Sequence, residues 1–226
     1  MALLLNIDTA TTVGSVCLSK DGEVLETIIN QQQRDHAASM VLLVQTIMKN
    51  HGITQHELDA IAVSAGPGSY TGLRVGVATA KGLCYTWDKP LVAISTLQMM
   101  AQGMLLQQQD QTAYYVPMID ARRMEVFTAV YDATLQAVEA PSAHILEPSS
   151  YQSVIAEKEV YFFGDGAAKW QTLLGENVQH AHFPVYEISA AHMVPLAEKA
   201  FQNQSFANLA YFGPDYLKAF YHPSKK

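Results

Sequence analysis

The sequence predicts an α/β protein made of two lobes. Three observations predict this class. Three strand-like stretches follow one another near the N-terminus, and helical and strand-like patterns alternate beyond them. A glycine-rich break at residues 66–68 joins a β-branched strand directly to a helical segment. The length of 226 residues suits one large domain or two lobes of roughly 110 residues each.

The first lobe begins with three strands. A turn at Asp21-Gly22 separates the second from the third, which predicts an antiparallel meander over residues 3–7, 14–19 and 23–30. Five more elements complete this lobe. They are a helix over 36–49, a strand over 59–64, a helix over 71–85 and a strand over 91–94, with a further helix over 96–106.

The helix over 36–49 carries more apolar residues than one face of an amphipathic surface helix needs, so we expect burial on two sides. It is either a central helix of its own lobe or part of a protein interface. The short neighbouring strands favour an interface shared with the helix over 71–85, because a standard interface removes about 800 Å² per partner. The expected contact residues are Met40, Leu43, Val44, Ile47, Gly72, Leu73, Gly76, Val77 and Ala80.

Small residues recur every four positions along the second of these helices. Gly72, Gly76 and Ala80 share one face, which lets another backbone approach closely. The glycine-rich loop before the helix could instead bind an anion at the helix N-terminus. Close packing is the favoured interpretation, because the Gly-Lys pair of a Walker loop is missing. Ser69 also lies outside a G-x-S-x-G hydrolase elbow.

A polar run at 107–111 marks the lobe boundary, which divides the chain into residues 1–106 and 107–226. The second lobe is expected to contain strands over 114–120, 124–131, 135–146 and 160–163. Apolar residues recur at helical spacing over 189–201, and Pro195 within this stretch predicts either a helix that begins near Val194 or a kink. We expect this helix to pack back on the first lobe.

Three motifs resemble those of the bacterial TsaB (YeaZ) family. They are L-L-N-I-D-T-A-T-T-V-G-S-V-C-L at 4–18, G-P-G-S-Y-T-G-L-R-V-G at 66–76 and I-D-A-R-R-M-E-V-F at 119–127. The resemblance covers the chain from end to end, although Phe127 stands where many relatives have Tyr. It implies two ribonuclease-H-like lobes in an actin-like ATPase (ASKHA) fold, and the order of the predicted elements suits that fold.

In actin-like ATPases a phosphate-binding turn follows the first strand, where this chain has Asp8-Thr9-Ala10-Thr11-Thr12. Asp8 could hold Mg²⁺ through water, and the threonines could meet phosphates. Equally, these side chains could cap the turn. The candidate nucleotide-binding residues are Asp8, Thr9, Thr11, Gly66 and Gly68. ATP or ADP would be the ligand, in the cleft between the lobes or at the interface of a complex.

No metal site is expected. The related TsaD enzymes bind a metal through H-x-x-x-H on a helix, but the residue four positions after His36 is Met40. His180 and His182 could chelate from a strand, although a lone pair beside apolar residues is more often structural. No nucleophile with a base is recognisable either, so no catalytic residue is assigned.

Two arginines follow Asp120 in the third motif. Arg122 or Arg123 could clamp a carboxylate or a phosphate. The favoured alternative is that Asp120, Arg123 and Glu125 pair across the sheet.

The charge balance argues against strong RNA binding by the chain alone. Lys and Arg total 14 against 21 Asp and Glu, a net charge of −7, so any tRNA contact should come through a complex. The two cysteines lack C-x-x-C spacing and are expected to be buried, reduced thiols. We expect no membrane association and a cytoplasmic location, because no long apolar stretch or signal-peptide pattern is present.

The TsaB resemblance implies a non-catalytic subunit required for threonylcarbamoylation of the adenosine 3′ of the anticodon (t6A), in tRNAs that read codons beginning with A. It would dock on and activate the TsaD transferase, with TsaE on the TsaB–TsaD complex and TsaC supplying threonylcarbamoyl-adenylate. Alone it would form a homodimer through the same helices. The alternatives are a self-sufficient ATP-dependent, kinase-like enzyme and, least favoured, a peptidase.

Overall fold

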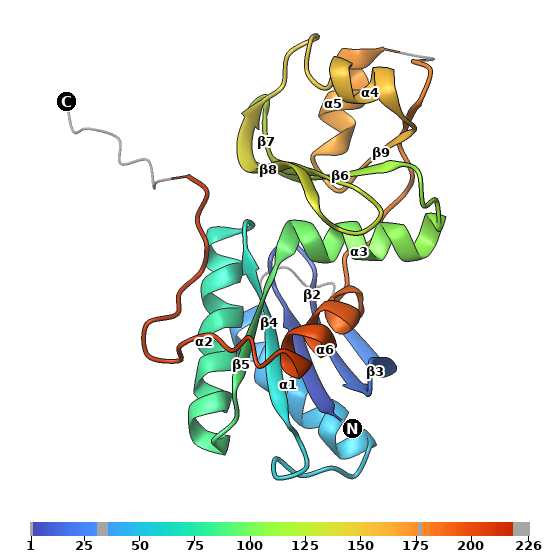
Figure 1. Cartoon of the computed structure of the whole chain (residues 1–226). Coiled ribbons are helices and arrows are strands. Elements are labelled where there is room, and N and C mark those ends of the chain that lie inside the picture. The colour runs from blue at the N-terminus through green and yellow to red at the C-terminus, as the bar shows by residue number, and fades with distance from the viewer. Residues whose placement is uncertain (1, 31–35, 176–177, 219–226) are drawn as a thin grey trace, which may run out of the picture.

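The computed structural model describes residues 2–30, 36–175 and 178–218, which form two mixed five-stranded sheets (Figure 1). The strand orders are β3-β2-β1-β4-β5 and β10-β9-β6-β7-β8. Listed from its other edge, the second sheet has the order β8-β7-β6-β9-β10. In both sheets, therefore, the first strand of the lobe lies in the middle, with the next two strands on one side and the last two on the other. The strands are β1 Leu3–Asp8, β2 Gly14–Lys20, β3 Glu23–Asn30, β4 Ala60–Gly66, β5 Leu91–Ser95, β6 Tyr114–Asp120, β7 Glu125–Tyr131, β8 Ala137–Ile145, β9 Val160–Phe163 and β10 Ala181–His182.

The predicted meander is confirmed in the first sheet. β1 pairs antiparallel with β2, from Leu3 opposite Lys20 to Asp8 opposite Ser15, and β2 pairs antiparallel with β3. β4 then pairs parallel with β1, and β5 pairs parallel with β4. The carboxyl ends of β1 and β4 therefore meet at one edge of the sheet, where the β1–β2 turn faces the start of the following helix.

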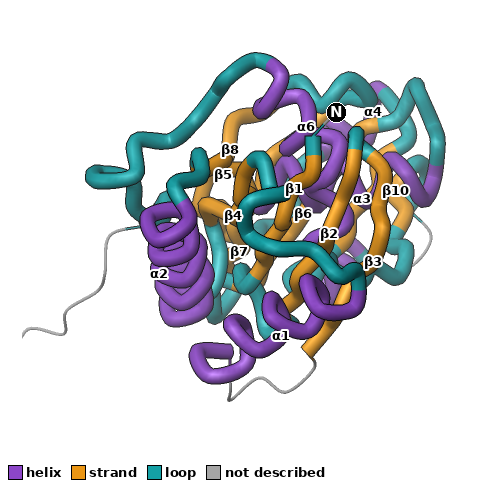
Figure 2. Tube along the Cα trace, turned by 90° about the horizontal axis from the view of Figure 1, so that it is seen from below, coloured by secondary structure: helices purple, strands orange, loops and turns teal. Residues whose placement is uncertain are grey.

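Helices cover both faces of the first sheet. α1 (His36–Asn50) and α2 (Tyr70–Trp87) lie side by side on one face (Figure 2). On the other face lie α3 (Thr96–Gln108), the short 3₁₀ helix η1 (Ala190–Met193) and α6 (Val194–Gln202). α6 begins at Val194 with Pro195 in its first turn, as the sequence predicts. α6 packs against β1 and β5 of the first sheet.

α3 lies between the two sheets (Figure 1). It ends at Gln108 rather than near residue 106, and buried side chains occur all round it. Leu97 and Met100 belong to a core that includes Val92 of β5 and Tyr115 of β6. One continuous core therefore joins the two sheets, which explains why α3 has no polar face.

The outer face of the second sheet is covered by α4 (Gln152–Glu157) and α5 (Ala167–Leu174). Trp170 of α5 is fully buried, with its ring 5.6 Å from Tyr151 and 6.1 Å from Phe162. These aromatic contacts form a separate core that holds α5 on the sheet.

Both cysteine thiols are free and buried, as expected from the sequence. Burial raises the pKa of Cys17 to about 11, against the opposing hydrogen bond with Thr27, and burial raises that of Cys84 to about 12. Both thiols are therefore protonated at neutral pH and unreactive. Among the helices described, none combines the length and apolar character that a membrane span requires.

Candidate functional site

The β1–β2 turn is packed tightly against α2. Thr9 Oγ1 donates a hydrogen bond of 2.7 Å to the Gly72 carbonyl oxygen, and the Ser69 N–H donates one of 2.7 Å to the Ala10 carbonyl oxygen. A Cβ atom on Gly72 would overlap the Thr9 carbonyl oxygen, and one on Gly76 would overlap Thr9 Oγ1. The small-residue face of α2 therefore receives a turn of its own chain, which supports the close-packing interpretation.

The side chains of the turn also make hydrogen bonds within it. Asp8 and Thr9 are 0% exposed, and Asp8 Oδ1 accepts the Ala10 N–H at 3.0 Å. Thr11 Oγ1 likewise accepts the N–H of Val13 within the turn. These interactions are those of a capped turn, one of the two alternatives that the sequence left open.

The two glycines before α2 are closed in as well. A Cβ atom on Gly68 would overlap the Ala10 carbonyl oxygen, and one on Gly66 would overlap the Asp215 carbonyl oxygen. Gly66 also has a φ of +120°, which only glycine adopts readily. The five residues expected to bind nucleotide thus all take part in packing or turn contacts within the chain.

The expected partner-contact residues face the interior of this chain. Eight of them are buried against the first sheet or the β1–β2 turn: Met40, Val44, Ile47, Gly72, Leu73, Gly76, Val77 and Ala80. Leu43 is half-buried and packs against the same core. As a list of surface contacts the prediction needs correction, because these side chains form the inner faces of α1 and α2.

The opposite faces of the two helices are exposed and carry apolar residues. Val41 is 42% exposed, Leu42 60% and Tyr85 83%, and a Cβ atom on Gly82 would meet nothing within 4 Å. We call Val41, Leu42, Ala78, Gly82 and Tyr85 the outer helix face. The alternative that α1 is a central helix of its own lobe is therefore wrong. A helical repeat through Met40, Val44 and Ile47 would have placed Val41 and Leu42 outside.

A second group of polar residues surrounds the β6–β7 turn. Lys169 Nζ lies 2.6 Å from Asp120 Oδ1, and Lys218 Nζ lies 2.5 Å from Glu125 Oε2. The Arg122 N–H donates a 2.6 Å hydrogen bond to Asp120 Oδ1. The favoured pairing of Arg123 with these two carboxylates is wrong, because lysines from α5 and from the chain's C-terminal part take both positions.

Arg122 and Arg123 themselves lie in an unusual backbone conformation. Their φ angles are +75° and +52°, in the left-handed region that favours glycine, and both residues are exposed. A non-glycine residue in this region destabilises the folded state by about 1–3 kcal/mol, and here two such residues follow each other. The strain marks this turn as a candidate functional feature.

The C-terminal strap, residues 203–218, connects the two parts of the site (Figure 1). The Asp215 N–H donates a 2.7 Å hydrogen bond to the Ala65 carbonyl oxygen, and Lys81 Nζ of α2 donates one of 2.7 Å to the Phe212 carbonyl oxygen. The Tyr216 ring lies 5.1 Å from the Tyr70 ring. The strap therefore runs past the N-terminal end of α2 and reaches the β6–β7 turn through Lys218.

The ion pair with Lys169 helps to lower the pKa of Asp120. Partial burial alone would raise its pKa, but hydrogen bonds from Lys169 Nζ and the Arg122 N–H, with the charges of both side chains, hold it below the usual value of 3.8. Burial raises the pKa of the neighbouring Asp165, whose Oδ1 accepts the Asp120 N–H at 2.8 Å.

Replacing Lys169 by methionine should therefore lower stability in a pH-dependent way. The pKa of Asp120 is depressed in the folded state, so its contribution is present above pH 3.8 and is lost as the pH falls through the folded-state pKa. We expect Lys169→Met to reduce the free energy of unfolding by less than about 1 kcal/mol at neutral pH. Urea unfolding at about pH 7 and about pH 2 measures this, and an equal loss at both would assign the effect to packing of the lysine stem.

Comparison of the chain with known proteins identifies its family. The family profile "TsaD: tRNA N6-adenosine threonylcarbamoyltransferase" matches residues 23–219. The tRNA threonylcarbamoyladenosine biosynthesis protein TsaB of Haemophilus influenzae is 29% identical over 95% of this chain and 93% of its own length. Its Bacillus subtilis counterpart is 26% identical over 95% and 93%. The chain belongs to the TsaB (YeaZ) family, which is related to TsaD. It is a TsaB homologue of the t6A pathway, in a family of generally non-catalytic proteins.

Solved structures agree with this TsaB assignment in fold. YeaZ from Pseudomonas aeruginosa is 23% identical with a TM-score of 0.78, over 96% of this chain and 100% of that one. The ADPNP-bound activator of 2-hydroxyisocaproyl-CoA dehydratase from Clostridium difficile is 10% identical with a TM-score of 0.52, over 90% and 96%. The predicted fold of two lobes in the ASKHA class is confirmed.

Histidines near the surface of this TsaB homologue pair with a carboxylate. His182 Nε2 lies 2.5 Å from Glu159 Oε2, and His180 Nδ1 contacts Glu159 Oε1. Hydrogen bonds from His182 and His180 lower the pKa of Glu159. Within the described ranges, no three His, Cys, Asp or Glu side chains are arranged to hold a metal ion. The side chain of His36 lies outside the described residues.

Proposed function

We propose that this TsaB homologue is the non-catalytic subunit that docks on TsaD and is required for threonylcarbamoyl transfer to the adenosine 3′ of the anticodon. The substrates would be tRNAs that read codons beginning with A. The observation that carries the proposal is the outer helix face, an apolar surface on two adjacent helices. Together with the family assignment, this surface supports a subunit that acts by binding a partner.

The docking mode follows from the exposed residues. Val41 and Leu42 on α1 and Tyr85 on α2 offer apolar contact area, and Gly82 leaves room for a partner side chain between them. TsaD is the proposed occupant, packing equivalent helices on the outer helix face. In its absence a second copy of this chain would use the same surface, giving a homodimer. TsaE would bind the assembled pair, and tRNA would bind only through the complex.

The closed β1–β2 turn argues against a self-sufficient ATP-dependent enzyme. Thr9 and the α2 glycines pack against each other, so their side-chain hydroxyl and close backbone approach already serve the fold. Any ATP or ADP in the assembly would therefore bind to another subunit or to groups outside this turn.

Reconstituted threonylcarbamoyl transfer tests the proposal. We expect transfer to tRNA by TsaC, TsaD and TsaE to fall to background when this chain is omitted, and likewise when TsaD is omitted. Transfer by this chain without TsaD would contradict the proposal and identify an enzyme. Full transfer without this chain would show that it is not a required subunit. A matched sample that contains heat-denatured chain controls for small molecules carried over with the protein preparation.

A further inference from the structure

We propose that the β6–β7 turn and the end of the C-terminal strap contact the phosphate backbone of the tRNA within the assembled complex. This inference rests on the proposed function, since it needs the tRNA to be held beside this chain. The surface consists of Arg74, Arg122, Arg123, Lys169 and Lys218, which we call the basic edge. It joins the exposed side of α2 to the second sheet.

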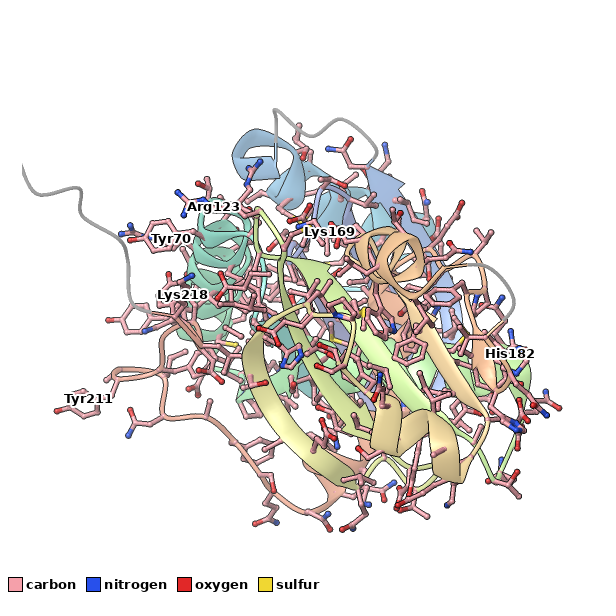
Figure 3. All side chains as sticks on the ribbon, turned by 90° about the horizontal axis from the view of Figure 1, so that it is seen from above. Tyr70, Arg123, Lys169, His182, Tyr211 and Lys218 are labelled. Carbon is pink, nitrogen blue, oxygen red and sulfur yellow. The ribbon has the colours of Figure 1, made fainter. Side chains whose placement is uncertain are left out.

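The basic edge gathers cationic side chains in an acidic protein. It contains five of the chain's 14 Lys and Arg residues, whereas the net charge of the whole chain is −7. Lys169 and Lys218 meet at the β6–β7 turn through Asp120 and Glu125, and Figure 3 shows Tyr70, Arg123 and Lys218 toward the same edge of the molecule. Four carboxylates, those of Asp120, Glu125, Asp165 and Asp215, lie among these five cations, so the positive charge open to a polyanion is mainly that of the exposed arginines.

The two arginines at the turn are available to a ligand. Lys169 and Lys218 are already paired with Asp120 and Glu125, and Asp165 and Asp215 add two more carboxylates nearby. The guanidinium groups of Arg122 and Arg123, in contrast, are exposed and make no hydrogen bond with a described residue, although the charge of Arg122 acts on Asp120. Guanidinium groups bind phosphate oxygens in a bidentate manner, so these two side chains would carry most of the contact.

The strained backbone at these two positions also supports a functional role for their side chains. Arg122 and Arg123 have positive φ angles, where glycine or asparagine would be more stable. Residues retained in an unfavourable conformation on an exposed turn indicate that their side chains have a role beyond folding.

Exposed aromatic rings lie beside the basic edge. Tyr70 and Tyr216 pack at 5.1 Å, and the Arg74 guanidinium carbon lies 5.3 Å from the centre of the Tyr70 ring. Aromatic rings interleaved with cations are typical of surfaces that bind unpaired nucleotides. Arg74 and Tyr70 belong to the first turns of α2, so the basic edge continues into the surface proposed to meet TsaD. RNA bound by TsaD would therefore lie within reach.

The first experiment measures the affinity of the chain–TsaD complex for unmodified tRNA as a function of salt. In the variant Arg122→Asn with Arg123→Gly, we expect affinity to fall roughly tenfold and the slope of log Kd against log salt concentration to fall by about 2. Asn and Gly suit positive φ, so the melting temperature should be unchanged or higher. Arg122→Lys with Arg123→Lys should retain most of the affinity. An unchanged Kd and slope in the Asn/Gly variant would overturn the proposal.

A matched variant controls for net charge. Lys20→Gln with Lys199→Gln also removes two exposed cations, but from β2 and α6, and should leave the slope unchanged. An equal loss in this control would show a general charge effect and contradict a contact at the turn. Loss of ATP binding in the Asn/Gly variant, with tRNA binding intact, would assign the arginines to a nucleotide and equally overturn the proposal.

Photo-crosslinking gives an independent readout in the complete transfer mixture. A benzophenone amino acid at Met124, which is exposed at the same turn, should crosslink to tRNA, whereas one at the exposed Val138 of β8 should not. Crosslinks only to protein, or none, would overturn the tRNA contact. Failure of the proposed function would be seen separately, as transfer that does not depend on this chain.

Discussion

Replacing Gly72 by alanine should lower the free energy of unfolding by about 3 kcal/mol. In an open helix the same substitution would stabilise by about 1 kcal/mol, because alanine is the better helix former. Here the added Cβ atom would overlap the Thr9 carbonyl oxygen, a backbone atom directly after β1. Neither β1 nor α2 can move without disturbing the core that the first sheet forms with α1 and α2, so the sign of the effect reverses.

A matched control lies in the same helix. Gly82 has nothing within 4 Å of the position of an added Cβ, so Gly82→Ala should raise stability by about 1 kcal/mol. Urea unfolding of the two variants measures both effects. Equal effects of the two substitutions would mean that helix propensity, and not the contact with the β1–β2 turn, explains Gly72. Gly76 should behave like Gly72, because its added Cβ would overlap Thr9 Oγ1.

Replacing Leu42 and Gly82 together by arginine should weaken binding to TsaD by at least about 100-fold, equivalent to about 2.7 kcal/mol. Both positions are on the outer helix face, and the two arginines would bring unpaired charge into the apolar centre of the proposed interface. Because both positions are exposed and arginine is a good helix former, the melting temperature should not fall, and the replacement of Gly82 should raise it slightly.

Binding of purified TsaD, followed by titration calorimetry, measures this effect, with t6A transfer as a second readout. Val138→Arg is the matched control, since Val138 is another exposed apolar residue, on β8 of the other sheet. If the double variant binds TsaD as tightly as the unaltered chain does, the outer helix face is not the docking surface. Substituting Gly76 would not test docking, because that position contributes to the core.

The pattern of the sequence was sufficient to predict most of the elements. The meander of β1, β2 and β3 follows from alternating apolar residues and the Asp21-Gly22 turn, and the start of α6 follows from Pro195. Both signals are local, because they depend on backbone preferences within a few residues. The repeated order of the two sheets has no comparable signal, because the lobes share little more than a strand ending in Ile-Asp.

The candidate site was harder to predict because it depends on which residues meet across the fold. The glycines of α2 could equally serve a phosphate, a partner or the chain itself, and only the position of Thr9 decides among them. Arg123 and Asp120 lie close in sequence, yet Lys169 and Lys218, far along the chain, provide the ion pairs.

By itself, therefore, the sequence determined the α/β class, the order of most elements and, through three motifs, the family. These properties are encoded by periodicity and by short runs of residues. Only the tertiary structure decided that α1 and α2 turn Met40 and Gly72 inward and Leu42 and Gly82 outward. It alone also closed the turn after Asp8 and left Arg122 and Arg123 exposed. The physical reason is that helix orientation and ion pairing are set by the packing of segments distant in sequence.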